Sequence, residues 1–197
     1  AVEGNHIDVV RTLLENGADV DLTGTGFTPL MRAADLGHVQ LMRLLLKYGA
    51  DPDARPRFNS TTALMRAARR GHLSAVSLLL EQDVKIEARG KEGRTAMWLA
   101  SFFGHVDVVR SLARAKAKVD AADDYGATPL MAASQENQID VIRTLLDFNA
   151  SKEMSDYKLG YTALHYAADA GTEDALAVLL NRGAKIEAKS KVSRAIG

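Results

Sequence analysis

Residues 26–51 read GFTPLMRAADLGHVQLMRLLLKYGAD, and this stretch decides the fold. Thr28 is a residue type favoured at helix N-caps, and Pro29 fits the first helical turn that follows. Gly37 can end this short helix in the left-handed conformation. A second helix then carries apolar residues spaced i, i+1, i+4, i+5, which form one apolar stripe. The stretch therefore predicts two short helices followed by an extended connector.

The same pattern recurs along the chain at intervals of 33 or 34 residues. The capping threonine returns in each of five units, as Thr28, Thr62, Thr95, Thr128 and Thr162. Two short helices cannot bury their apolar stripe alone, so the units are expected to stack into one elongated domain over residues 1–197. We divide it into a partial repeat 1–22, full repeats at about 23–54, 55–88, 89–121, 122–154 and 155–188, and a C-terminal stub 189–197.

This pattern resembles the ankyrin repeat family, whose units read Gly-x-Thr-Pro-Leu-His-x-Ala-Ala, then Gly-His, paired valines, paired leucines and Gly-Ala-Asp-Val-Asn. The resemblance covers Ala1 to about Ala188. It implies an all-α fold, an ankyrin-repeat solenoid of stacked helix-turn-helix units joined by short hairpin-like connectors. The chain departs from the family where the Thr-Pro-Leu-His histidine survives only as His165, with methionines or Trp98 in the other full repeats.

A second departure concerns the glycine that closes the second helix of each unit. Asp83, Lys116 and Asn149 occupy this position in three of the repeats. Asparagine tolerates a positive φ, but a lysine there costs about 1–2 kcal/mol. We therefore expect an altered second-helix end in the third full repeat.

Composition excludes several functional classes. Lys plus Arg number 25 and Asp plus Glu number 25, so the net charge is zero and a general nucleic-acid binder is disfavoured. The absence of cysteine excludes disulfides, zinc–thiolate sites and thiol nucleophiles. No apolar run is long enough for a membrane span and no signal peptide is recognisable. We expect no membrane partner and an intracellular, cytoplasmic location, with the nucleus as the alternative.

The sequence contains no recognisable catalytic motif. All five histidines fall at repeated positions of the units, which favours structural roles for His6, His38, His72, His105 and His165. The segment Gly24-Thr25-Gly26 lacks the Gly-Lys-Ser/Thr of a phosphate-binding loop. We predict a chain that is not an enzyme and has no cofactor and no metal site.

Candidate binding residues follow from the resemblance, which implies that a partner contacts the connector tips and the first helices on the concave side. Arginines occupy these positions in the early repeats and aromatic residues in the later ones, so this surface should change from basic through aromatic to acidic. The candidates are Arg32, Arg57, Phe58, Arg66, Arg69, Arg70, Arg94, Phe102, Phe103, Tyr125, Tyr161 and Tyr166. Arginine and aromatic residues are enriched at binding hot spots, although a solvated face with scattered charges remains the alternative interpretation.

The leading functional hypothesis is a protein–protein interaction scaffold or adaptor. Its partner would be another protein, bound through an acidic or phosphorylated segment. A second hypothesis is a regulatory segment of a larger enzyme, channel or signalling protein, because the chain starts at Ala1 within a partial repeat. A third is a nucleic-acid or phosphate-ligand binder that uses the arginine cluster, which the zero net charge disfavours. We expect a monomer, with self-association through the repeat ends as the alternative.

Overall fold

The computed structural model describes residues 1–23, 26–56 and 60–186, and these residues form eleven α-helices and one 3-10 turn with no β-strand. Helix α1 (Ile7–Glu15) comes before five helix pairs. The pairs are α2 (Pro29–Leu36) with α3 (Val39–Lys47), α4 (Ala63–Arg70) with α5 (Leu73–Leu80), α6 (Ala96–Phe102) with α7 (Val106–Arg114), α8 (Pro129–Gln135) with α9 (Ile139–Asp147), and α10 (Ala163–Ala170) with α11 (Glu173–Asn181). The all-α solenoid expected from the sequence is confirmed.

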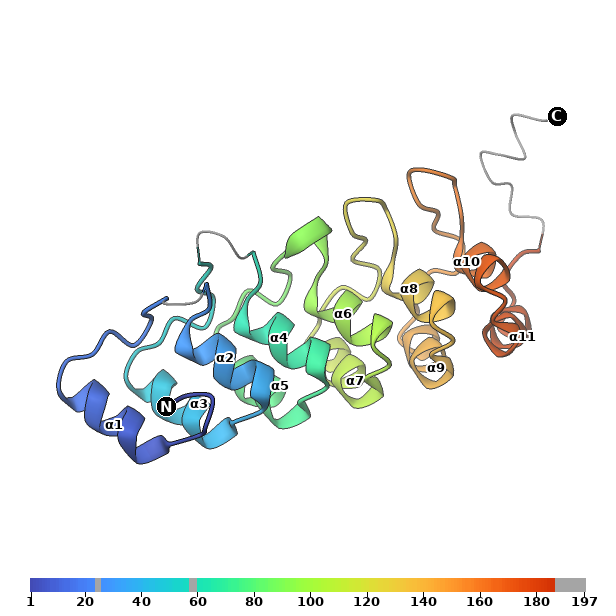
Figure 1. Ribbon diagram of the computed structural model, residues 1–197. Helices are drawn as coiled ribbons and strands as arrows, with labels where there is room; N and C mark the ends of the chain where they lie inside the picture. Colours follow the sequence, from blue (N-terminus) through green and yellow to red (C-terminus); the bar gives the residue numbers. More distant parts are fainter. Residues whose placement is uncertain (24–25, 57–59, 187–197) are drawn as a thin grey trace.

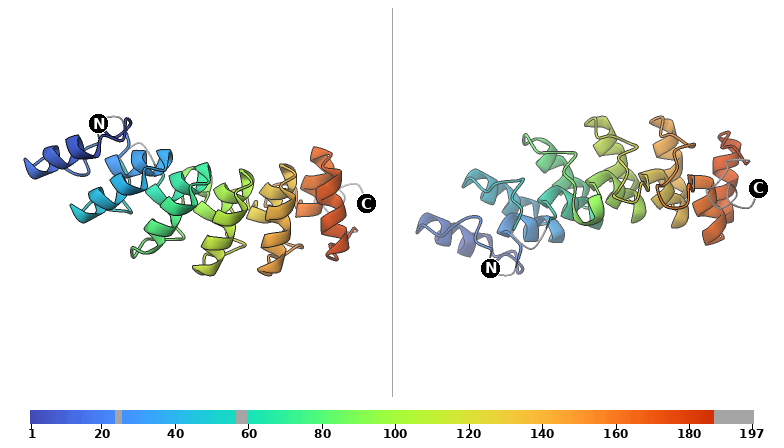
Figure 2. Two further views of the ribbon diagram at one scale, coloured as in Figure 1. Left: turned by 90° about the horizontal axis from the view of Figure 1, so that it is seen from below. Right: turned by 90° about the horizontal axis from the view of Figure 1, so that it is seen from above.

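The helix pairs follow one another in a single elongated row (Figures 1 and 2). The first helices of the pairs pack against one another in one layer, and the second helices form the other layer. The connectors project from the side of the first helices, and we call them fingers (Figure 1). The 3-10 turn η1 (Lys91–Gly93) lies in the finger that precedes α6.

Each first helix begins at the threonine that the sequence predicts. The hydroxyls of Thr28, Thr62, Thr95 and Thr128 each accept a hydrogen bond from the backbone N–H three residues later, at 3.2–3.3 Å. Such a cap is worth about 1 kcal/mol relative to alanine. The caps fix the start of each first helix and therefore the place where each finger ends.

The core is the continuous seam between the two helix layers. The second helices contribute apolar residues that are at most 1% exposed, among them Leu41, Leu45, Val76, Leu79, Val109, Leu112, Ile142 and Leu145. The first helices contribute alanines at 0% exposure, such as Ala33 and Ala67, which let adjacent helices approach closely. Each large buried side chain stabilises the stack by about 1.5–3 kcal/mol, a gain that exists only because the repeats are neighbours.

A row of carboxylates joins each repeat to the next one. Asp21, Asp53, Glu87, Asp120 and Glu153 each accept a hydrogen bond from a backbone N–H 30–32 residues further along the chain. The distances lie between 2.7 and 3.2 Å. These residues occupy the connector position that holds asparagine in the family pattern. We call them the carboxylate row.

The prediction of an altered second-helix end in the third full repeat is wrong. Lys116 adopts the left-handed conformation, with φ 68°, and α7 ends with the same backbone bonds as the regular repeats. The altered end occurs one repeat earlier, where α5 stops at Leu80 and Asp83 has no positive φ. There the backbone turns through a short bond of 2.7 Å from the Val84 N–H to the Gln82 carbonyl. Packing in the stack thus holds the lysine in a strained conformation, while the aspartate avoids one.

Three histidines connect neighbouring repeats. The Nε2 atoms of His38, His72 and His105 lie 3.4, 3.2 and 2.9 Å from the backbone carbonyls of Glu3, Asp35 and Arg69. His165 instead lies at the start of α10, where its Nδ1 accepts from the Thr162 N–H at 3.3 Å. These contacts give the histidines structural roles in the stack.

Candidate functional site

The first helices and the fingers form the two walls of a groove, which we call the inner groove. Ten of the twelve candidate residues predicted from the sequence are described, and they lie on α2, α4, α6 or α10, directly after α6, or on the fingers. Arg57 and Phe58 lie outside the described residues. Some of the described candidates already pair with other side chains of the protein, and others do not.

Arg66 and Arg70 share an internal partner that the sequence analysis did not anticipate. Asp35, on the preceding first helix α2, is 7% exposed and lies 3.5 Å from Arg66 Nη1 and 3.3 Å from Arg70 Nε. Arg70 also donates from Nη2 to the second carboxylate oxygen at 3.4 Å. Burial lowers the pKa of Arg66, opposed by Asp35. The two arginines thus neutralise a buried carboxylate.

Arg32 is also engaged within the protein. Its Nη2 lies 2.9 Å from the carboxylate of Glu3. Its guanidinium and that of Arg66 both lie over the ring of Phe27, at 5.4 and 4.1 Å from the ring centroid. Phe27 therefore joins two arginines of adjacent repeats, which stabilises the basic end of the groove.

Arg69 differs from its neighbours on α4. Its side chain is exposed and its guanidinium lies 5.3 Å from the centroid of the Phe103 ring. Among the carboxylates of the described residues, none forms an ion pair with Arg69. A guanidinium without an internal counter-ion, held over an aromatic ring, is suited to receive a carboxylate or phosphate from a partner.

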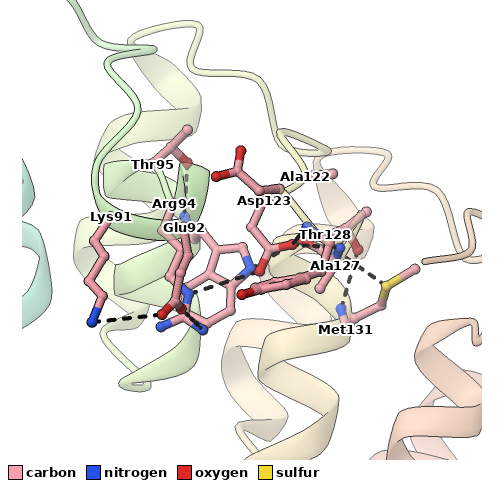
Figure 3. Close-up of polar contacts among 12 residues, drawn as sticks. Lys91, Glu92, Arg94, Thr95, Ala122, Asp123, Ala127, Thr128 and Met131 are labelled. Atoms are coloured by element: carbon pink, nitrogen blue, oxygen red, sulfur yellow. Dashed lines mark hydrogen bonds and ion pairs between the residues drawn. The ribbon is translucent and has the colours of Figure 1, made fainter. Parts of the chain in front are cut away.

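Trp98 organises the middle of the groove. The guanidinium of Arg94 lies 4.2 Å from the centroid of its indole ring, and the ring of Phe102 stacks at 5.3 Å. The indole N–H donates to the Ala127 carbonyl at 3.1 Å, which connects the next finger to α6. Arg94 also pairs with Glu92 at 2.8 Å (Figure 3). Trp98 was noted in the sequence only as a departure from the repeat pattern, and that substitution was the signal of its role.

A first hollow lies between α4 and α6 and has a volume of about 340 Å³. We call it the cationic hollow. Its polar lining is basic and its floor is aromatic, with Arg66, Arg69, Lys91, Arg94, Trp98, Phe102 and Phe103 among the lining residues and no carboxylate. Burial lowers the pKa of Arg66 and Asp35 opposes this effect, while the charges of Arg69 and Arg32 lower the pKa by smaller amounts.

A second hollow lies on the other side of the Trp98–Phe102 pair and has a volume of about 450 Å³. We call it the aromatic hollow. Its lining includes Phe102, Tyr125, Tyr166, Asp123 and Asp156. Both carboxylates are nearly buried, at 3% and 4% exposure. The two hollows share Arg94, Trp98 and Phe102, so they are adjacent subsites of one groove.

Carboxylates surround the Tyr166 hydroxyl in the aromatic hollow. Burial first, and then the carboxylates of Asp156, Asp123 and Asp169, raise the pKa of Tyr166 to about 12. The Tyr166 hydroxyl donates to Asp156 at 3.2 Å. Tyr161 stacks on His165 and meets the edge of Tyr166, and it supports this wall from behind. The cationic hollow is therefore lined by basic side chains without a carboxylate, and the aromatic hollow by two carboxylates together with Arg94 and Lys158.

Comparison with known protein families accounts for the repeats. The family model described as "Ankyrin repeats (3 copies)" matches residues 1–56, 54–123 and 115–190. The chain belongs to the ankyrin-repeat family. Ankyrin repeats generally serve as protein–protein interaction modules. A comparison with curated proteins finds no match.

Two further observations concern other kinds of site on these ankyrin repeats. Within residues 1–23, 26–56 and 60–186, no group of three or more His, Cys, Asp or Glu side chains is arranged to hold a metal ion. None of the helices in the same ranges has the length and apolar character needed to cross a membrane. The inner groove is therefore the surface on which we base a function.

Proposed function

We propose that this ankyrin-repeat chain acts by binding rather than by catalysis, and that its inner groove captures an acidic segment of a partner protein. The cationic hollow supports this proposal most directly. It combines four basic side chains with an aromatic floor and has no lining carboxylate. An acidic side chain entering it exchanges water for charge-assisted hydrogen bonds above an apolar surface.

Arg69 is the anchor of this proposal. Arg66 already neutralises Asp35, and Arg94 already pairs with Glu92. The Lys91 side chain is 87% exposed, and its Nζ lies 3.9 Å from the Glu92 carboxylate. This ion pair is loose, so Lys91 at the rim of the hollow is available to a ligand. Of these four side chains, Arg69 alone is exposed and also lies over an aromatic ring. A partner carboxylate would therefore contact Arg69 first, with Lys91 as a second, weaker contact.

Selection of linear peptides from a displayed random library tests the proposal. The wild-type chain should enrich peptides that carry Asp or Glu next to an apolar or aromatic residue. Binding of such a peptide should change the emission of Trp98, the only tryptophan of the chain, because its ring lies between the two hollows. Arg69→Glu should weaken the selected peptides at least about tenfold, as expected for a charged hot spot.

Arg143→Glu is the matched control, because Arg143 lies on the second-helix layer and only approaches Asp140 at 3.9 Å. It should leave peptide affinity unchanged, and both variants should keep the wild-type circular dichroism. The proposal fails if no acidic peptide is enriched, or if Arg69→Glu and the wild type bind the selected peptides equally. Preferential binding of an oligonucleotide, with a steep loss of affinity in salt, would instead support a phosphate-binding role.

A further inference from the structure

The aromatic hollow, unlike the cationic hollow, contains a carboxylate with an oxygen that lacks a hydrogen bond from the protein. Asp123 is 3% exposed, and its Oδ1 accepts hydrogen bonds from the backbone N–H groups of Tyr125 and Ala127 at 2.9 Å. Its Oδ2 approaches only Arg94 Nε, at 3.9 Å, which is too long for a hydrogen bond. Arg94 Nε is itself buried without a hydrogen-bond partner. This nearly buried carboxylate therefore has an oxygen that its own protein leaves incompletely satisfied.

Further charged groups line this hollow. Asp156 accepts hydrogen bonds from three backbone N–H groups of its finger at Oδ1 and from the Tyr166 hydroxyl at Oδ2. The charge of Arg94 is compensated by Glu92 at 2.8 Å, and Lys158 is exposed on its finger. The hollow thus presents carboxylate oxygen at its base and has the exposed Lys158 among its lining residues.

Aromatic rings form the walls above these carboxylates. Phe102, Tyr125 and Tyr166 all line the hollow, and Tyr125 is 55% exposed at the tip of its finger. Aromatic faces attract cations, and the attraction is larger in a partly desolvated site.

We propose that the aromatic hollow receives a lysine or arginine side chain of the partner segment, whose cation lies between the rings and pairs with Asp123. This inference rests on the proposed function in one respect, because it takes the acidic side chain at Arg69 as the other anchor. The two hollows occupy successive junctions between first helices. Packed helices lie about 8–10 Å apart, and an extended chain rises about 3.3 Å per residue. The acidic and basic residues of the partner should therefore be about three positions apart.

Small probes test the cation subsite independently of the acidic anchor. N-acetyl-arginine amide should shift the Trp98 indole N–H signal in NMR spectra, and its neutral isostere N-acetyl-citrulline amide should not. Tyr125→Ser and Asp123→Asn should each weaken the arginine probe about tenfold, as expected when a hot-spot contact is lost. Asn retains the side-chain oxygen that accepts the two backbone N–H groups. Asp140→Asn, on the second helix α9, is the control and should leave the affinity unchanged.

Two short peptides test the spacing. One carries Glu and Arg separated by two alanines, and the other carries them in reverse order. One order should bind at least about tenfold more tightly than the other, because Arg69 and Asp123 carry opposite charges at fixed positions. Moving the charges one residue closer should remove this preference. Equal affinity for both orders, or equal shifts with arginine and citrulline probes, would overturn the inference.

The outcomes of these tests separate the two proposals. Arg69→Glu should abolish the acidic contact yet leave the arginine probe bound. If the arginine probe binds and acidic peptides do not, the cation subsite stands and the proposed function fails. If acidic peptides bind through Arg69 while the arginine probe shows no preference over citrulline, only the cation subsite fails.

Discussion

The first helices α4 and α6 place different residue types at the same three positions of the inner groove. These positions hold Arg66, Arg69 and Arg70 in α4, and Leu99 and Phe102 in α6 with Phe103 directly after it. In α4, Arg66 and Arg70 pair with Asp35, and Arg69 forms no ion pair with a carboxylate of the described residues. In α6, the apolar side chains pack around Trp98 and form a wall between two hollows. Exposure of a position in the repeat therefore does not decide whether its side chain is available.

Removing the centre of the α6 cluster should have the largest effect. Trp98→Ala deletes a side chain that is 4% exposed, its stack on Phe102 and its bond to the Ala127 carbonyl. We expect the free energy of unfolding to fall by about 3–5 kcal/mol, measured by urea denaturation. Trp98→Met, which restores the residue of three other repeats, should cost about 1–2 kcal/mol. A loss below about 1 kcal/mol for the alanine variant would show that the α6 cluster is peripheral.

Removing the shared carboxylate of the α4 arginines should have the next largest effect. Asp35→Ala leaves Arg66 half-buried without a counter-ion, and we expect a loss of about 2–3 kcal/mol in the same assay. Asp140→Ala is the control, because Asp140 is 77% exposed and its ion pair with Arg143 is loose. It should change stability by less than about 0.5 kcal/mol. Equal losses for the two variants would contradict an internal role for Arg66.

A smaller electrostatic effect is expected for Asp120, which lies in the connector after α7. Burial raises the pKa of Asp120 above 3.8, opposed by the hydrogen bond from Ser151. A carboxyl group with a raised pKa binds its proton more tightly in the folded state. Its contribution to stability is therefore complete below about pH 3.8 and is lost as the pH rises through the raised pKa.

Asp120→Asn removes this titration and keeps an oxygen that can accept from Ser151. We expect the variant to be more stable than the wild type by up to about 1 kcal/mol at pH 7. The gain should shrink toward pH 3.8, as thermal unfolding at several pH values would show. A gain of the same size at every pH would mean that burial of the charge is not its cause.

The smallest effect is expected at the end of the second helix α7. Lys116 ends the α6–α7 unit with φ 68°, a conformation that glycine adopts without strain. Lys116→Gly should raise the free energy of unfolding by about 0.5–1 kcal/mol, after the entropic cost of glycine is included. Ala115→Gly, at φ −77°, should lower it by a similar amount. A loss in both variants would show that the lysine makes compensating contacts.

The repeat interval predicted the fold well because capping and packing are local and recur in every unit. Thr28 and its counterparts cap their helices as the sequence indicated, and the paired apolar residues of the second helices are buried. The third repeat was the exception. A propensity argument placed an altered helix end at Lys116, but the packing of the stack offset the strain there.

The site was less predictable because several of its contacts join residues of different repeats. Asp35 lies one repeat before Arg66 and Arg70, and its pairing with them depends on how adjacent helices face one another. An acidic residue on the first helix that precedes a basic first helix was the available signal. Trp98 was missed as the wall of two hollows because its bond to the Ala127 carbonyl joins it to the finger of the next repeat.

The carboxylate row bears on how such a chain can change in evolution. Each carboxylate accepts from a backbone N–H, and the residues that donate are Asp51, Lys85, Lys118, Ser151 and Lys185. Because every residue except proline has this donor, the bond does not depend on which side chain follows. A repeat can therefore be duplicated, deleted or exchanged as a whole unit, and the new neighbours recreate the same junction. Groove residues are free to diversify while the junctions stay interchangeable.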